Sequence, residues 1–158
     1  MNGLRARGYA AFGIDPTPEV LGVALDYFDS DWFRELGVEG LAPERLAGLG
    51  IPDTYDVILI TGNVPAFFSG EALRQAFAQV SALLKPGGIF VVGTSSHSRG
   101  GPQDQDEAVG RTALGLMHRF SDWHLGQYSR DSAWSVSVYA ALGESSWPET
   151  PDGIFILT

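Results

Sequence analysis

The chain has 158 residues, which is the size of one domain, and we predict a single domain spanning residues 1–158. Its composition is 44% hydrophobic and 18% charged, which indicates a globular fold and excludes a disordered chain. Ten Lys and Arg residues against nineteen Asp and Glu residues give a net charge of −9. Such an acidic chain lacks the basic surface that nucleic acids and anionic membranes attract, so we expect neither as a partner.

The sequence contains no cysteine, which excludes disulfides, thiolate metal sites and a cysteine nucleophile. Residues 1–7 lack the apolar run of a signal peptide, and no stretch approaches the roughly 20 apolar residues of a membrane span. We therefore expect a cytoplasmic protein.

The first part of the chain reads as a strand, a tight turn and a helix. Residues 8–15 form an apolar run that ends in Asp15, and Thr17 is a candidate N-cap with Pro18 at the first helical position. Helical spacing of apolar residues continues to Phe28. Residues 30–50 are less regular: 31–33 fit a short helix or an edge strand, 37–41 an extended piece, and 43–49 one or two helical turns.

The middle of the chain carries the clearest pattern. Residues 55–61 (YDVILIT) predict a strand buried on both faces, and Gly62 and Asn63 end it. A helix follows over 71–84, capped by Ser69 or Gly70, and the sequence KPGG stops it. Residues 89–93 (IFVVG) predict a second buried strand, which we expect beside the first and parallel to it.

The last third is polar at first and then rich in aromatic residues. Residues 94–106 read as a loop and 107–117 as a helix. Residues 123–128 and 134–140 read as two strands joined by a hairpin turn at 129–132. Strands that alternate with helices indicate an α/β fold with a mostly parallel sheet, closed here by a C-terminal antiparallel hairpin.

Three stretches in this order resemble the class I S-adenosylmethionine-dependent methyltransferases: GYAAFGIDPTPEVLGVA (8–24), YDVILITGNV (55–64) and LRQAFAQVSALLKPGGIFVVGTSS (73–96). The resemblance implies a Rossmann-like methyltransferase fold, S-adenosylmethionine as cofactor and a small-molecule substrate.

The sequence departs from this family in two places. In the family, a first strand and a glycine-rich loop precede the region that matches Gly8, whereas here only seven residues precede it and no G-x-G cluster lies before Asp15. Members often carry an acid where this chain has Leu41 after Gly40; Glu39 or Glu44 are the candidates to replace it. We therefore expect a truncated or permuted version of the fold and weak or absent cofactor binding by the isolated chain.

Four residues are candidates for cofactor binding. The resemblance implies that Asp15 accepts hydrogen bonds from both ribose hydroxyls, which suits an ionised carboxylate; the alternative is a carboxylate that caps the following helix. Thr61, Gly62 and Asn63 follow the carboxyl end of a strand, where ligands of open α/β sheets bind. The alternative for these three is an ordinary turn.

His97 is the candidate catalytic residue, because a histidine on a loop after a strand can act as a general base near pH 7. The alternative is a solvated loop histidine, and His124 reads as structural. No histidine pair has metal-ligand spacing with nearby acids, so we predict no metal site.

Two functions remain open from the sequence. One is a methyltransferase acting on a small molecule. The other is a non-methylating relative that keeps the fold as a binding module, a partner subunit or a repurposed small-molecule enzyme. The apolar run 153–158 (GIFILT) is a candidate for the missing central strand, within one chain or exchanged in a strand-swapped homodimer.

Overall fold

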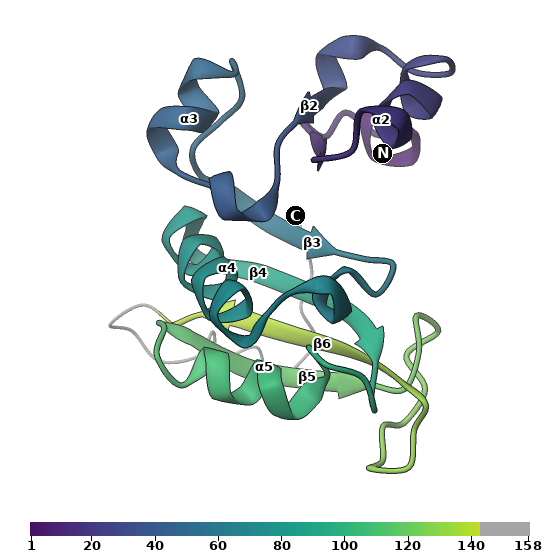
Figure 1. Cartoon of the computed structure of the whole chain (residues 1–158), viewed down its shortest axis with the longest axis vertical. Helices are drawn as coiled ribbons and strands as arrows, with labels where there is room; N and C mark the ends of the chain where they lie inside the picture. Colours follow the sequence, from purple (N-terminus) through teal and green to yellow (C-terminus); the bar gives the residue numbers. More distant parts are fainter. Residues whose placement is uncertain (143–158) are drawn as a thin grey trace. The chain divides into compact units, whose positions relative to one another are not determined.

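The computed structural model describes residues 1–142 (Figure 1). They fall into two compact units that divide after Asp53, and each unit is described by itself. The prediction of a single domain is not tested by this division. The predicted strand 153–158 lies outside the described residues.

The first unit contains the predicted strand and helix, and a second short strand follows them. Strand β1 (Gly13–Asp15) pairs in parallel with β2 (Phe33–Glu35), with Asp15 opposite Glu35, and helix α2 (Pro18–Leu25) connects them. The strand is therefore shorter than the predicted 8–15, and a short helix, α1 (Asn2–Arg5), precedes it. Thr17 is the residue before α2, as predicted, but its side chain makes no capping hydrogen bond.

The irregular stretch after α2 contains three short helices. They are η1 (Ser30–Trp32), η2 (Val38–Gly40) and α3 (Pro43–Gly48). The helical prediction for 43–49 is confirmed, whereas the extended piece predicted at 37–41 is wrong. The N–H of Gly40 donates to the carbonyl of Gly37 at 2.9 Å, which closes a 3-10 turn there.

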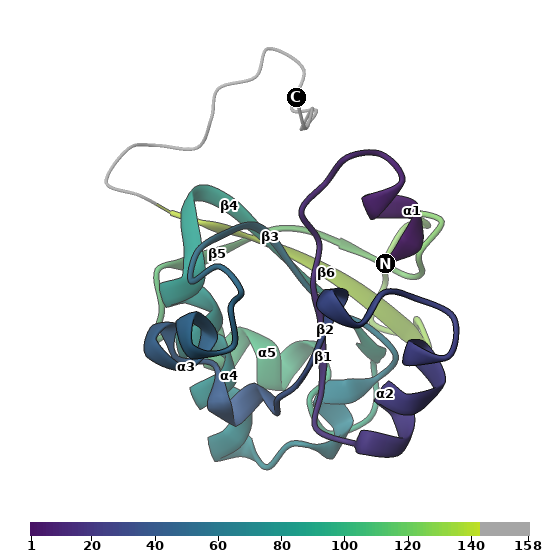
Figure 2. The same cartoon turned by 90° about the horizontal axis from the view of Figure 1, so that it is seen from above.

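The second unit is a four-stranded sheet with two longer helices. In chain order its elements are β3 (Tyr55–Ile60), η3 (Val64–Phe67), α4 (Gly70–Leu83), β4 (Leu84–Ser95), α5 (Pro102–Val109), β5 (Leu114–Phe120) and β6 (Trp134–Ala141). The strand order is β3-β4-β6-β5. Figures 1 and 2 show α4 and α5 on the same face of this sheet.

The predicted pairing of the two apolar strands is confirmed. β3 and β4 are parallel, with Val57 opposite Ile89 and Ile60 opposite Val92. The prediction that both are buried is wrong for β3, because β3 is the edge strand of the described sheet and Leu59 leaves 49% of its surface exposed. Its apolar sequence alone did not reveal that only one of its edges is paired.

Helix α4 forms where it was predicted. Its cap is Ser69, whose hydroxyl accepts a hydrogen bond from the N–H of Ala72 at 3.1 Å. The helix buries Phe77 against Phe90 of β4 and Tyr139 of β6, with ring centroids 5.0 and 5.8 Å away. This aromatic cluster is the centre of the core between the sheet and α4.

Two predictions in the last third are wrong. The helix predicted at 107–117 is α5 at 102–109, and residues 114–120 form β5 instead. The strand predicted at 123–128 is absent from the described structure, since only Gln127 bridges back to Phe120. The antiparallel closure exists, and β6 confirms the strand predicted at 134–140, but its partner is β5 and not residues 123–128. The strand pairs are mixed: β1–β2 and β3–β4 are parallel, whereas β4–β6 and β5–β6 are antiparallel.

Candidate functional site

The carboxyl ends of β3 and β4 lie at the same edge of the sheet, because the two strands are parallel neighbours. Two loops leave this edge, 61–69 after β3 and 96–101 after β4. In open α/β sheets this edge is where ligands bind. Three of the predicted site residues after β3 and the predicted catalytic histidine after β4 therefore belong to one region of the second unit.

Asn63 ties the two strand ends together. Its Oδ1 accepts hydrogen bonds from the Thr94 hydroxyl at 2.6 Å and from the Ser95 N–H at 2.9 Å. The backbone of Asn63 is left-handed, with φ of 65°, a conformation that asparagine tolerates better than most residues. Asn63 thus has a structural role whatever else its side chain does.

Thr61 and Gly62 precede Asn63 in the same turn. Both are exposed, and Gly62 has a φ of +72° that a side chain would strain. Both Gly62 and Asn63 therefore have the left-handed backbone of an ordinary turn, which is the alternative to a role in cofactor binding. Its backbone remains accessible beside the end of β3.

His97 lies on the turn that begins after β4 and is exposed. It is two residues from Ser95, whose N–H Asn63 binds, so the structure brings the loop of His97 beside the Asn63 turn. Arg99 further joins the loops, because its guanidinium donates to the carbonyl of Ala66 at 3.1 and 3.2 Å. His118 and His124 lie apart from these loops along the chain, on β5 and in the turn after it.

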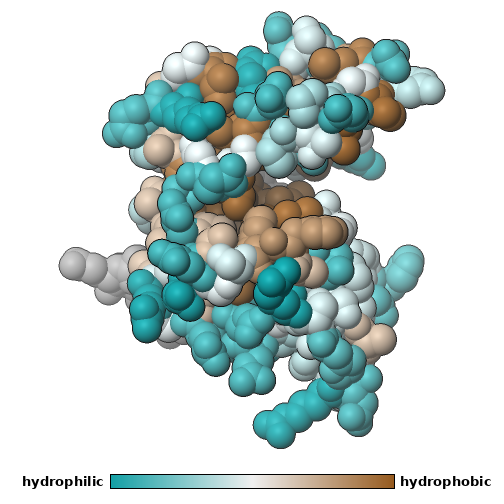
Figure 3. Space-filling view, viewed as in Figure 1, coloured by the Kyte–Doolittle hydropathy of each residue, from teal (hydrophilic) through white to brown (hydrophobic). Residues whose placement is uncertain are grey.

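An apolar surface adjoins these loops, and sequence reasoning missed it. Phe67 in η3 leaves 80% of its side chain exposed and Val64 leaves 39%. Figure 3 shows apolar surface over the end of β3 and η3. A second aromatic residue, Trp123, packs on the backbone of β4 at Gly93, where any Cβ would collide with the indole. The signal in the sequence was the run VPAFF (64–68) directly after a strand end.

Asp15 ends β1 in the first unit. Its Oδ1 accepts a hydrogen bond from the Thr17 N–H at 2.9 Å, which forms an Asx turn leading into α2 without capping the helix. The carboxylate is half-buried, and its second oxygen makes no hydrogen bond within residues 1–142. One oxygen therefore shapes the turn while the other is available to a ligand. The structure places Asp15 in a different unit from the loops of Asn63 and His97.

A polar network lies beneath α5 and has no part in these loops. Arg119 of β5 binds Asp106 of α5 through both terminal nitrogens, at 2.6 and 3.2 Å, and donates to the Tyr139 hydroxyl at 3.2 Å. Burial alone would lower the pKa of Arg119, but the hydrogen bond to Asp106 and the nearby charges leave it raised. Burial raises the pKa of the Tyr139 hydroxyl. Because Tyr139 also donates to Gln105 at 3.1 Å, the network is well satisfied and structural.

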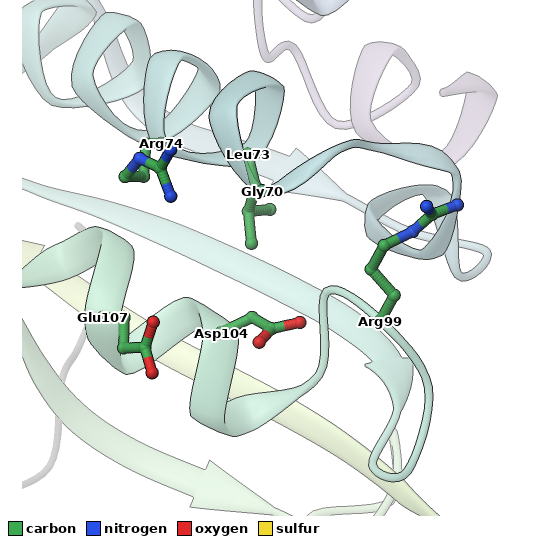
Figure 4. Close-up of a pocket in the computed structure, with 6 residues that line it drawn as sticks. All are labelled: Gly70, Leu73, Arg74, Arg99, Asp104 and Glu107. Atoms are coloured by element: carbon green, nitrogen blue, oxygen red, sulfur yellow. The ribbon is translucent and has the colours of Figure 1, made fainter.

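The cavity in Figure 4 lies between α4 and α5 and has a volume of about 240 Å³. Two of its lining charges are already engaged, since Arg99 binds the carbonyl of Ala66 and Asp104 accepts from the N–H of Gly100 at 2.7 Å. None of the predicted site residues lines it. Across residues 1–142, no three acidic or histidine side chains gather closely enough to hold a metal ion. Over the same range no helix has the length and apolar character to cross a membrane.

Comparisons with known proteins find relatives in structure and not in sequence. No family model and no curated protein sequence matches the chain. Among solved structures, the chain is similar to a TehB-like S-adenosylmethionine-dependent methyltransferase from Corynebacterium glutamicum, at 23% identity and a TM-score of 0.65, over 82% of this chain and 67% of the other.

Two further structures have the same fold. The CcbJ methyltransferase from Streptomyces caelestis aligns with 87% of this chain and 82% of its own, at 17% identity and a TM-score of 0.68. An amino pentose methyltransferase from Micromonospora echinaspora, solved with S-adenosylmethionine bound, aligns with 89% of this chain and 78% of its own, at 12% identity and a TM-score of 0.65. The chain therefore has the Rossmann-like fold of the class I S-adenosylmethionine-dependent methyltransferases, as the sequence resemblance implied.

Proposed function

We propose that this chain is an S-adenosylmethionine-dependent methyltransferase that acts on a small molecule. The observation that carries the proposal is Asp15, whose carboxylate ends β1 and keeps one oxygen without a partner within residues 1–142. In an α/β fold of this class, that position is suited to a ligand with vicinal hydroxyls. The amino pentose methyltransferase among the structural neighbours supports a small molecule as acceptor.

The chemistry of the candidate residues fits this cofactor. An aspartate carboxylate accepts two hydrogen bonds from a ribose diol. The exposed backbone of Thr61 and Gly62 offers further polar groups at the edge where ligands of this fold bind. Val64 and Phe67 expose apolar side chains near the same edge, so a ligand that covers them is shielded from water on that side, which favours displacement at a charged centre.

When bound, S-adenosylmethionine supplies a methyl group on a positively charged sulfur. We assign to His97 the role of accepting the proton that the hydroxyl or amine of the acceptor loses. Asn63 acts as a positioning residue, because it holds the loop of His97 against the end of β3. Positioning of the two reactants supplies most of the rate enhancement in this assignment.

Isothermal titration calorimetry with S-adenosylmethionine and S-adenosylhomocysteine tests the proposal. We expect binding that Asp15→Ala weakens at least about tenfold, the loss of one charge-assisted hydrogen bond. Asp29→Ala is the matched control, because Asp29 also accepts from the N–H two residues on, at 2.9 Å, without ending a strand. Equal cofactor affinities for the two variants would show that Asp15 does not bind the cofactor.

His97→Asn tests the chemical step separately. We expect it to lower kcat by about 10²-fold or more while the affinity for the cofactor stays unchanged. The acceptor has to be found first by screening small hydroxyl and amine compounds with a labelled methyl group. An unchanged kcat would show that His97 takes no part in the reaction and is a solvated loop residue.

The second candidate is a relative that does not transfer methyl groups. The feature that favours it is the structural role of two candidate residues, since Asp15 accepts a hydrogen bond from the Thr17 N–H and Asn63 accepts from Thr94 and Ser95. Weak or absent cofactor binding by the isolated chain stays our prediction. No heat of binding at millimolar cofactor would support this second candidate and overturn the first. The cytoplasmic location and the absence of nucleic-acid partners stay predictions from composition.

A further inference from the structure

The cavity between α4 and α5 is lined by charged side chains of both signs. Arg74 and Arg99 carry positive charges and Asp104 and Glu107 carry negative charges, so the charges of the lining balance. Leu73, which is only 2% exposed, adds an apolar side chain. The volume of about 240 Å³ lies below the roughly 300–1,000 Å³ of pockets for drug-sized ligands, so the cavity suits a smaller molecule.

Two of these charges are held in place by hydrogen bonds to the backbone. The guanidinium of Arg99 donates to the carbonyl of Ala66 through Nε and Nη2, at 3.2 and 3.1 Å. The Oδ2 of Asp104 accepts from the N–H of Gly100 at 2.7 Å, whereas its Oδ1 accepts no hydrogen bond within residues 1–142. Side chains that are already held lose little conformational freedom when a ligand binds, so the lining is partly preorganised.

The other two charges, those of Arg74 and Glu107, are unpaired within residues 1–142. Over that range neither side chain makes a hydrogen bond or an ion pair, with the other or with a third residue. The Nη1 of Arg74 lies 3.5 Å from the place that a Cβ on Gly70 would take, so the guanidinium lies over the first turn of α4. Figure 4 shows Arg74 on α4 and Glu107 on α5, on opposite sides of the cavity.

We propose that this cavity binds a small zwitterionic amino acid. A guanidinium binds a carboxylate through two parallel hydrogen bonds, which assigns the carboxylate of the ligand to Arg74. An ammonium group has three donors and no acceptor, which assigns it to Glu107 and to the free Oδ1 of Asp104. A ligand with a net charge, such as phosphate, would face charges of its own sign across the cavity. The proposal does not depend on the proposed function, because none of the candidate cofactor or catalytic residues lines the cavity.

NMR titration of the whole chain tests the proposal, with L-alanine as the probe. We expect millimolar L-alanine to shift the amide resonances of residues 70–74 and 104–107 and to leave those of β1 and β2 unchanged. Propionate lacks the ammonium group and ethylamine lacks the carboxylate, so each should bind at least about tenfold more weakly. Unchanged resonances at 70–74 and 104–107, or equal affinities for the three compounds, would overturn the proposal.

Two substitutions test the assigned residues, each with a matched control. Arg74→Gln and Glu107→Gln should each weaken L-alanine binding at least about tenfold, because each removes charge-assisted hydrogen bonds to the ligand. Arg111→Gln and Glu71→Gln are the controls, since Arg111 and Glu71 are exposed charges of the same unit that do not line the cavity. All four side chains are exposed, so we expect every variant to fold. Equal affinities in the cavity variants and their controls would overturn the proposal.

Thermal unfolding gives a second measurement on the same variants. A ligand that binds the folded chain raises its Tm. We expect L-alanine to raise the Tm of the natural chain more than an equal concentration of propionate does, and we expect Arg74→Gln to abolish that difference. An equal rise with both compounds in the natural chain would show a general solvent effect and would overturn the proposal.

Discussion

The side-chain oxygen of Asn63 accepts a hydrogen bond from the hydroxyl of Thr94 at 2.6 Å and so joins the carboxyl ends of β3 and β4. Thr94 is fully buried, and the same oxygen also accepts from the N–H of Ser95. A buried hydroxyl that loses its acceptor is costly. The geometry of the candidate site therefore depends on Asn63, which is also one of the candidate binding residues.

We expect Asn63→Ala to lower the free energy of unfolding by about 2–4 kcal/mol, because two hydrogen bonds are lost and alanine is strained at a φ of 65°. Asn63→Gly removes the strain and should recover about 1 kcal/mol of that loss. Asn63→Asp keeps the acceptor oxygen and should remain the most stable of the three. Urea unfolding measures all of them, and an alanine variant as stable as the natural protein would contradict the role assigned to this side chain.

Tyr139→Phe should destabilise the protein by about 1–3 kcal/mol, because the buried Oε1 of Gln105 loses its donor. The phenyl ring keeps the packing against Phe77 and Phe90, so a cavity does not contribute. Tyr9→Phe is the control, since Tyr9 is 51% exposed. Thermal unfolding compares the two, and an equal melting temperature for both variants would contradict the prediction.

Two glycine substitutions should change the free energy of unfolding in opposite directions. Gly93→Ala forces the Trp123 indole off β4, and we expect a loss of about 1–3 kcal/mol with a shift of tryptophan fluorescence. Gly22→Ala lies in the interior of α2 with open space around it, and we expect a gain of about 0.4–1 kcal/mol. Chemical denaturation measures the free energy of unfolding of both variants. A stable Gly93→Ala variant with unchanged fluorescence would show that Trp123 does not pack there.

The turn after β5 should loosen in acid. The N–H groups of Gly126 and His124, donating to the carboxylate, hold the pKa of Asp122 below the usual range for aspartate. A lowered pKa in the folded state means that the stabilisation is complete above about pH 4 and is lost as the pH falls through the folded pKa. Amide resonances of His124 and Gly126, followed by NMR, should titrate below pH 4 and should not titrate in Asp122→Asn. Titration at or above pH 4 would contradict the prediction.

Sequence patterns predicted β3, α4 and the inner part of β4, because each has a continuous apolar run or a clear helical period with a cap. They failed at 102–120 because the polar stretch before α5 hides its start. Pro102 after Gly101 is the signal that was missed, since proline favours the first helical position. Residues 123–128 look like a strand by composition, but Asp122 binds the N–H groups of His124 and Gly126 and turns the chain instead.

The candidate site was predictable only in part. Asp15 and Asn63 were found because polar residues at strand ends are readable in the sequence. The hydrogen bonds of Asn63 to Thr94 and Ser95 were not, since they join residues more than 30 positions apart. Exposure of Phe67 was equally hidden, because an aromatic residue in a loop is as compatible with burial as with a surface position.

The position of β6 between β4 and β5 has a consequence for biosynthesis. β6 is the last strand of the described chain, and it pairs residues separated by about 50 positions, such as Ile89 with Ala140. During translation β4 and β5 are complete before their shared neighbour leaves the ribosome, so until then the apolar flank of β4 has no native strand beside it. Such distant pairing slows folding and extends the time in which nascent chains can associate. A chaperone that shields strand edges should therefore raise the yield of this protein more than it raises the rate of its final folding step.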